Sequence, residues 1–535
     1  MHFDADFIIV GAGSAGSLLA DRLSADGRHT VLLLEAGGPD SYPWLRIPIG
    51  YAKTFVNPRY NWMYQTEPEP ELKNRSIYWP RGKVLGGSGA INGLVYIRGD
   101  RRDYDDWQVP GWSFDELLPF FKQHEDYHGG ASAWHGAGGE ISVAKPVDRP
   151  ELCEMIIASA EAAGLKRNDD FNGPDQDGVG YYDLTTRNGF RSSSGSEMLR
   201  RAKSRPNLRI LTHTQATRLL FAADGRRVIG VEAMRGGDVV RCNARRETIL
   251  TLGAINTPQL LMVSGIGPAP ALRHQGIDVR LDSAGIGQNL QDHLQCRMVL
   301  RANRKITQND VLRSLWGKLG IGLDYIVRRR GLMTFAAGQV GAFFRSRPEL
   351  ERVDGQLLQF SFSAPKTGEP LHPFSGFTTT VSQLRPESRG EITLASADMR
   401  QAPKIAANYL STQTDRDFYV DALGVARSIF AKEPMASELH SEYWPGPQVS
   451  TRDEMLDYVR GMASTIFHPC GTVRMGADED APLYPDLSLR GVDGLRVADA
   501  SAIPTIVSGN INAPTLMIAE RAAAMVLADA ARRQD

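Results

Sequence analysis

The sequence predicts two domains of different class: an α/β domain on a parallel sheet, and an α+β domain on an antiparallel sheet with helices. Residues 7–35 read as strand, glycine-rich turn, helix and strand, in the order FIIV, GAGSAG, SLLADRLS and TVLLLE. Three strand-like runs, LLQFSFSAP, FTTTVSQL and GEITLAS, follow between residues 357 and 396, and no helical pattern separates the last two. Strand and helix then alternate again in LRVADASAIP and APTLMIAERAAAMVLADAA. We therefore expect both domains to be discontinuous.

The composition favours a small-molecule partner. The chain has 535 residues, with 61 Lys and Arg against 62 Asp and Glu, so its net charge of -1 gives no reason to expect nucleic acid. Cys153, Cys242, Cys296 and Cys470 lie far apart without a CxxC pair, which argues against a zinc cage and a disulfide scaffold and predicts no metal site. The first strand begins close to Met1 and leaves no room for a signal segment. We expect a cytoplasmic protein.

No stretch of 18 apolar residues predicts a transmembrane helix. The nearest candidate, LWGKLGIGLDYIVRRRG at residues 315–331, contains Lys318 and Asp324, and we expect a helix packed on a core. Its basic end leaves peripheral contact with a membrane surface as the alternative. Residues 39–80 are rich in Pro, Gly and aromatic residues and are interpreted either as a lid over the site or as an excursion packed on the core.

A dinucleotide fingerprint opens the first domain. Gly11, Gly13 and Gly16 form GxGxxG between a strand and a helix, where glycine permits a tight turn and close approach of a pyrophosphate. Glu35 ends the next strand, 35 minus 16 or 19 positions after the last glycine, at the place of a ribose ligand. FAD and NAD share this half of the cofactor, and there is no second fingerprint. One bound dinucleotide is predicted.

Further motifs carry a family resemblance. RGKVLGGSGAINGLVYIRG at residues 81–99 is a second glycine-rich run, and GAINTPQLLMVSGIG, HPCGTVRMG and SGNINAPTLMIAE follow in order. Together they resemble the signatures of the glucose-methanol-choline (GMC) oxidoreductases, FAD-dependent enzymes that oxidise alcohols. The resemblance implies a Rossmann-like FAD-binding domain at residues 1–150, 205–295 and 465–535. It also implies a substrate domain at residues 151–204 and 296–464.

The resemblance also implies which residues contact FAD. These are Gly11, Gly13, Ser14, Gly16, Glu35, Ala36, Arg81, Val84, Gly87, Asn92, Gly93, Leu94, Val95, Ala216, Asp499, Ala500 and Thr515. Some relatives attach FAD through a histidine at the position of Ile91, so non-covalent binding is expected here.

Alcohol oxidation needs a base for the hydroxyl proton and a donor to hold the oxygen. The resemblance assigns the base to His468, and we expect Asn512 as the donor. Asn510 is a weaker candidate, because an asparagine in SGN is also typical of a turn, and Cys470 is interpreted as structural, while His135 and His293 are assigned no chemistry.

The predicted reaction is oxidation of a primary alcohol, with an aliphatic or polyether alcohol favoured, to the aldehyde, and electron transfer to a quinone or cytochrome. The resemblance is to alcohol, polyethylene glycol, choline and sorbose dehydrogenases. The alternatives are an oxygen-using aryl alcohol or hydroxymethylfurfural oxidase, an FAD-containing hydroxynitrile lyase, and a non-catalytic FAD-binding protein. The sequence leaves the oligomeric state open.

Overall fold

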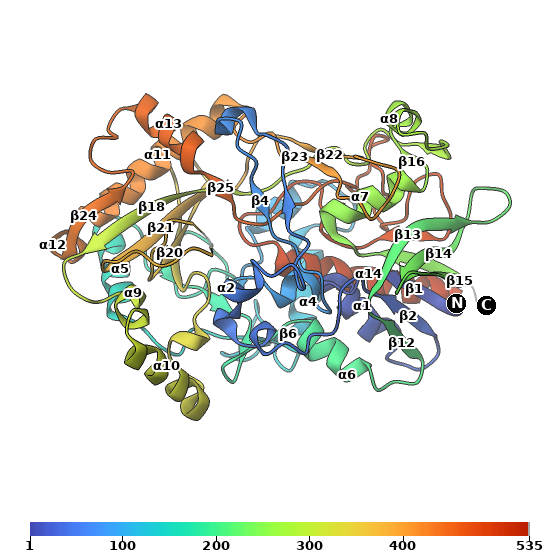
Figure 1. The fold of residues 1–535 in the computed structure, drawn as a ribbon, viewed down its shortest axis with the longest axis horizontal. Coiled ribbons are helices and arrows are strands. Elements are labelled where there is room, and N and C mark those ends of the chain that lie inside the picture. The colour runs from blue at the N-terminus through green and yellow to red at the C-terminus, as the bar shows by residue number, and fades with distance from the viewer. Residues whose placement is uncertain (367, 533–535) are drawn as a thin grey trace.

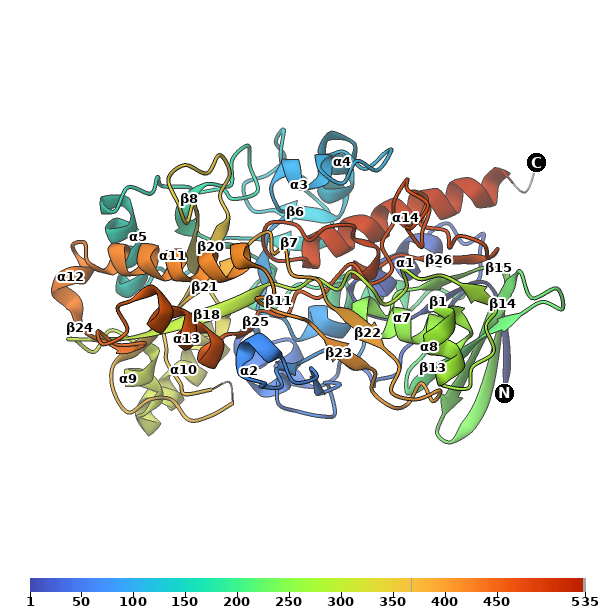
Figure 2. The ribbon, with the colours of Figure 1, turned by 90° about the horizontal axis from the view of Figure 1, so that it is seen from above.

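Two large sheets lie at opposite ends of the molecule (Figure 1). The computed structural model describes residues 1–366 and 368–532. Both termini lie at the end that carries the first sheet, and the second sheet lies at the other end, as the turned view also shows (Figure 2).

The first sheet is mixed, with parallel strands at its centre. Its strands, in order, are β12 (Leu208–Leu211), β2 (Val31–Leu34), β1 (His2–Val10), β15 (Asp238–Leu250), β14 (Val228–Arg235) and β13 (Thr214–Phe221), with β26 (Leu495–Val497) also paired to β15. Only the β13–β14 and β14–β15 pairs are antiparallel. All four residues of β2 are buried, as expected for a strand covered on both faces. The predicted Rossmann-like core is confirmed.

Two helices from opposite ends of the sequence pack together beside this sheet. They are α1 (Ser14–Leu23) and α14 (Asn512–Arg532). The contact brings the C-terminal segment back to the first glycine-rich turn, so residues about 500 positions apart meet there (Figure 2).

The second sheet is antiparallel throughout. Its strands are β24 (Leu439–Trp444), β18 (Leu294–Ala302), β21 (Gly376–Gln383), β20 (Gly355–Phe360), β19 (Val340–Phe344) and β8 (Gly178–Tyr181), with β25 (Ser464–Thr465) paired to β18. Leu300 and Phe377 pack in one apolar cluster with α5 (Glu151–Ala162) and α11 (Gln413–Phe430). The opposite face presents Arg297, Thr380 and Leu358, which are register partners, to a cavity. The predicted antiparallel sheet is confirmed, and the domain boundaries stay a prediction.

Shorter elements fill the space around and between the sheets. The helices include α2 (Tyr51–Thr54), α3 (Arg101–Asp105), α4 (Phe114–His124), α6 (Arg200–Ala202), α7 (Gly253–Val263), α8 (Ala269–His274), α9 (Gln308–Leu312), α10 (Leu315–Arg328), α12 (Met435–Glu438) and α13 (Arg452–Met462). The small two-stranded sheets include β3 (Tyr64–Gln65) with β4 (Tyr78–Trp79), and β22 (Glu391–Thr393) with β23 (Lys404–Ala406). The predicted strand GEITLAS is β22 and therefore lies outside the second sheet.

Two predictions about helical packing are wrong. The spacing of the apolar residues in PQLLMVSGIG, residues 258–267, predicts an amphipathic segment, but α7, which contains most of it, is buried on all sides from Ala254 to Met262. The helix expected at residues 315–331 exists as α10, yet it does not pack on a core, because only Tyr325 within it is buried. Across residues 1–366 and 368–532, no helix has the length and apolar character needed to span a bilayer.

Candidate functional site

A cavity of about 560 Å³ extends from the carboxyl ends of β1 and β2 to the second sheet. Gly16 and Val84 are buried and do not line it. The predicted lid segment contributes residues to the cavity wall, including Tyr51, Lys53 and Trp62. The other predicted cofactor residues all lie in its wall, namely Gly11, Gly13, Ser14, Glu35, Ala36, Arg81, Gly87, Asn92, Gly93, Leu94, Val95, Ala216, Asp499, Ala500 and Thr515.

The two glycine-rich runs touch each other at one end of the cavity. Gly11 has a φ of +102°, and a Cβ on Gly16 would lie 1.9 Å from the Gly11 carbonyl oxygen, so this glycine permits the close packing of α1 on the turn. A Cβ on Gly87 would lie 2.6 Å from the Cα of Gly13. Gly13 caps α1 without any side-chain bond, which leaves the helix N-terminus facing the cavity. This bare cradle fits the pyrophosphate of a dinucleotide.

Glu35 closes the same turn from the end of β2. Its Oε2 accepts a hydrogen bond from the Ala12 backbone N–H (3.0 Å), and its Oε1 accepts one from that of Gly37 (2.8 Å). Burial raises the pKa of the carboxyl to about 7. The side chain lies in the cavity wall, where the fingerprint expects a ribose ligand.

At the other end of the cavity, His468 is held in place through its backbone. Its N–H donates to Asp292 Oδ1 (2.7 Å), while Asp292 Oδ2 accepts from Thr465 Oγ1 (2.6 Å) and from the Tyr409 hydroxyl. Phe467, just before it, has a φ of +74°, a costly conformation for a bulky residue. The buried carboxyl therefore holds a strained turn that aims the imidazole at the cavity.

Hydrogen bonds fix which ring nitrogen of His468 carries the proton. His293 Nε2 lies 2.9 Å from the Leu384 carbonyl oxygen, which only accepts, so His293 carries its proton on Nε2. Its Nδ1 is then an acceptor, and His468 Nδ1, 3.0 Å away, donates to it. His468 Nε2 is left with a lone pair, which suits a general base.

The lone pair of His468 Nε2 meets Asn510. Asn510 Nδ2 lies 3.1 Å from it. Gln356 Nε2 donates to Asn510 Oδ1 (3.4 Å), so the amide N–H₂ points towards the imidazole. Asn512, the predicted donor, lines the cavity as the first residue of α14, but its Oδ1 accepts from Ser14 Oγ (2.8 Å). The structure thus brings Asn510 to His468 and places Asn512 at the glycine-rich turn.

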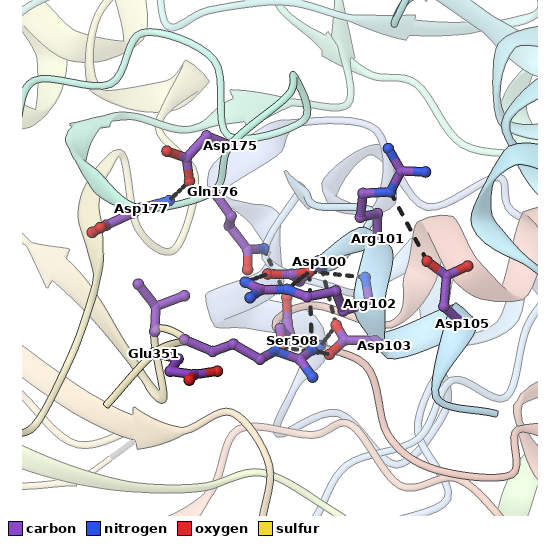
Figure 3. A network of polar contacts seen from close by, with 12 residues as sticks. Asp100, Arg101, Arg102, Asp103, Asp105, Asp175, Gln176, Asp177, Glu351 and Ser508 are labelled. Atoms are coloured by element: carbon purple, nitrogen blue, oxygen red, sulfur yellow. Dashed lines mark hydrogen bonds and ion pairs between the residues drawn. The ribbon is translucent and has the colours of Figure 1, made fainter. Parts of the chain in front are cut away.

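A buried polar network holds the segment that carries Asn510 (Figure 3). Asp103 Oδ2 accepts from the Ser508 backbone N–H (2.6 Å), and Asp103 Oδ1 accepts from Ser508 Oγ (3.0 Å). Gln176 Nε2 donates to the Ser508 carbonyl oxygen (2.9 Å). Arg352 Nη2 forms an ion pair with Asp103 at 2.7 Å. Ser508 is therefore fixed two residues before Asn510.

Burial keeps the two histidines neutral. The pKa of His468 is lowered well below its ordinary value by burial first, and then by His293 and the Arg81 guanidinium. Burial lowers the pKa of His293 to about 4. Both rings are thus uncharged at neutral pH, and His468 is able to take up a proton.

Sequence reasoning missed His293, Asp292 and Gln356. The first two lie in NLQDHL, which directly precedes β18, and this cluster of polar residues before a strand was the signal available. Gln356 lies within β20 with a second buried glutamine, Gln359, and a glutamine in a strand gives no such signal. Among the described residues, no group of three or more His, Cys, Asp or Glu side chains is arranged to hold a metal ion.

Comparisons with known proteins point to one family. The N-terminal and C-terminal family models described as GMC oxidoreductase match residues 5–295 and 386–519. An "Alcohol dehydrogenase [acceptor]" of Pseudomonas putida is 40% identical over 529 residues, covering 98% of this chain and 95% of the relative. An oxygen-dependent choline dehydrogenase of Brucella melitensis is 37% identical, covering 98% and 96%.

Solved structures give the same result. A pyridoxine 4-oxidase from "Mesorbium loti" superposes with a TM-score of 0.88 at 30% identity, covering 97% of this chain and 98% of that chain. A formate oxidase variant from Aspergillus oryzae gives a TM-score of 0.91 at 28% identity, covering 98% of each chain. With the glycine cradle, the cavity and the neutral histidine beside it, these matches lead to one conclusion. The chain belongs to the GMC oxidoreductase family and is an FAD-dependent oxidoreductase that acts on CH–OH donors.

Proposed function

We propose that the protein oxidises a primary alcohol to the aldehyde, with an aliphatic or polyether alcohol as substrate and a quinone or cytochrome, rather than oxygen, as acceptor. The observation that carries this proposal is the pair formed by His468 Nε2 and Asn510 Nδ2, 3.1 Å apart in the cavity wall. The Asn510 N–H donates to the lone pair of His468 Nε2, and a substrate hydroxyl would take the place of this bond, with its proton towards Nε2 and its oxygen towards the Asn510 N–H.

The two side chains act on different atoms of the substrate hydroxyl group. His468 Nε2 accepts the hydroxyl proton, a step worth about 100- to 10,000-fold in rate. Asn510 Nδ2 donates a hydrogen bond to the substrate oxygen as negative charge develops on it. An amide does not take up a proton at neutral pH, so the roles are not interchangeable. FAD, when bound, supplies the acceptor for the hydride that leaves the alcohol carbon.

Asn510 replaces Asn512 in the proposed catalytic pair. Asn512 is assigned instead to the cofactor end of the cavity, through its bond with Ser14 in the first glycine-rich turn. The proposal keeps the other FAD contacts that the sequence motifs predict, including those of the glycine cradle, Glu35 and Asp499.

The cavity wall favours an uncharged, partly apolar alcohol. Near His468 the wall includes Leu358, Phe360 and Ile466. Arg297 also lines it, while Glu369, the carboxylate on this side of the described wall, is exposed. A quaternary ammonium would lack a buried counter-charge there, which argues against choline.

The choice of acceptor rests on the relatives. The 40% identical relative is named for an unspecified acceptor, and a 37% identical relative is named as oxygen-dependent. An oxidase is therefore the second candidate, favoured by the likeness to pyridoxine 4-oxidase and formate oxidase structures. An FAD-containing hydroxynitrile lyase is a third, and it predicts no reduction of flavin by an alcohol.

The test is an anaerobic flavin spectrum of the purified protein during addition of butanol, a polyethylene glycol, benzyl alcohol, sorbose or choline. We expect bleaching of the oxidised-flavin band with the aliphatic or polyether alcohols and slow reoxidation in air. Rapid reoxidation with peroxide release would favour the oxidase. Bound flavin that no alcohol reduces would contradict alcohol oxidation.

Variants separate the proposed roles. His468→Ala is expected to slow reduction about 100-fold or more, and Asn510→Ala about 10-fold or more, while both retain flavin. Asn512→Ala is the matched comparison and should mainly weaken flavin retention. A larger rate loss in Asn512→Ala than in Asn510→Ala would return the donor role to Asn512.

A further inference from the structure

Helix α10 turns its apolar face to solvent. Leu315, Trp316, Leu319, Leu323, Ile326 and Val327 are each 64–82% exposed. At 100° per residue these positions fall within one 120° sector, so they form one stripe rather than scattered side chains. Seven of the 14 exposed large apolar residues in the described chain lie between Val311 and Val327. Such concentration marks an interaction surface.

The helix is anchored to the body of the molecule by its other side. The Tyr325 hydroxyl donates to the Gly189 carbonyl oxygen (3.1 Å), and the Arg329 guanidinium stacks over Phe190. Beyond the helix, the Gly331 N–H donates to Asp148 Oδ2 (2.7 Å). These contacts hold α10 at the edge of the molecule (Figure 1), and the apolar stripe on its other side is exposed.

Basic residues border the stripe. Residues 313–330 contain Arg313, Lys318 and the run Arg328 to Arg330 against one acid, Asp324. Arg313 pairs with Asp310 and Arg328 with Asp324, while Lys318 and Arg330 are exposed. An exposed apolar stripe with a cationic border matches the headgroup region of an anionic bilayer, whereas a purely apolar partner would leave this charge uncompensated.

The stripe lies near the exposed side of the substrate cavity. The short helix η6 (Leu332–Thr334) contacts both α10 and the short helix η2 (Pro48–Gly50), which leads into α2. Lys53 of α2 and Lys366 are exposed residues of the cavity wall and add positive charge there. A surface bound through α10 would therefore adjoin the cavity.

We propose that α10 docks the protein on a membrane surface containing anionic lipid, with its apolar stripe inserted at the headgroup level and Lys318 and Arg330 facing lipid phosphates. The helix lies in the plane of the surface. This assignment does not depend on which alcohol the enzyme oxidises.

The experiment is flotation of the purified holoenzyme with vesicles of phosphatidylcholine alone or mixed with phosphatidylglycerol. We expect binding to the mixed vesicles that weakens in high salt. Leu319→Glu/Leu323→Glu should lower the partition coefficient at least about tenfold. Lys318→Gln/Arg330→Gln should lower it about thirtyfold, since each cationic side chain contributes about 1 kcal/mol.

Val239→Glu/Tyr484→Glu is the matched control, because both residues are exposed and lie outside α10; its binding should equal that of the wild type. All variants should keep the flavin spectrum and the melting temperature of the wild type. The proposal is overturned if the wild type does not bind the mixed vesicles, or if the Leu319 and Leu323 variant binds as well as it does. A dimer that this variant dissociates, without any vesicle binding, would show instead that a second copy covers α10.

Discussion

At the scale of single residues, the carbonyl oxygen of Leu384 sets the proton position at His468. Because a carbonyl only accepts, it orients His293, and His293 in turn orients the imidazole of His468. His293 is thus a positioning residue that keeps the lone pair of His468 on Nε2. The assignment predicts that the rate of flavin reduction depends on an acceptor atom at residue 293, close to the position of Nδ1, and does not require an imidazole ring there.

His293→Leu removes that acceptor and should slow flavin reduction by a saturating alcohol about tenfold or more. His293→Asn places an oxygen close to the position of Nδ1 and should keep most of the rate. Anaerobic stopped-flow reduction compares the two variants. If the leucine variant is as fast as the asparagine variant, His293 is not the residue that orients the imidazole of His468.

Arg81 affects the same imidazole through its charge. The guanidinium Nη2 donates to the Phe467 carbonyl oxygen (2.8 Å), and the positive charge is one cause that lowers the pKa of His468. Removing the charge makes protonation of His468 easier and raises its pKa. In Arg81→Met, the acid limb of the rate–pH profile should therefore move to higher pH.

Arg81→Lys keeps the charge and is the control, whose acid limb should stay near that of the wild type. The measurement is the rate of flavin reduction at low alcohol concentration from pH 4 to 9, because the acid limb of the wild type lies below the ordinary pKa of histidine. An unmoved limb in the methionine variant would mean that another group titrates there.

At the scale of elements, α3 supports the loop that leads into α14. Asp103 in α3 is buried and bonds both to the backbone and to the side chain of Ser508 (Figure 3). It also forms an ion pair with Arg352. Replacing Asp103 with an uncharged residue leaves the partly buried charge of Arg352 without this partner. The position of Asn510 thus depends on a carboxylate more than 400 residues earlier in the sequence.

Asp103→Ala should lower the free energy of unfolding by about 2–4 kcal/mol and slow flavin reduction, because Asn510 loses its support. Asp115→Ala removes an exposed pair with Arg101 and should change stability by less than about 1 kcal/mol. Thermal unfolding and stopped-flow reduction are the measurements. Full activity in a destabilised Asp103→Ala variant would show that Asp103 stabilises the fold but does not position Asn510.

At the scale of the whole molecule, the sequence predicts features that have a local pattern and misses those that depend on long-range contacts. The Rossmann-like strands and α14 have strong local patterns, and the structure has them where expected. His293 and Asn510 lie in recognisable polar segments, but the segments do not reveal their roles, because these come from neighbours 175 and 42 positions away. In α10 the periodicity was visible, but periodicity does not tell whether an apolar face meets a core or solvent.

The central position of β1 also shapes how this protein is made. One neighbour, β2, follows directly in the chain, but the other, β15, ends at Leu250. A ribosome adding about 5–20 residues per second needs roughly 10–40 s to pass from the end of β2 to the end of β15. His468 and α14 follow later still in the chain. The nascent chain therefore exposes an incomplete sheet until β15 has emerged, and the flavin site stays incomplete until the segment that carries His468 has been made.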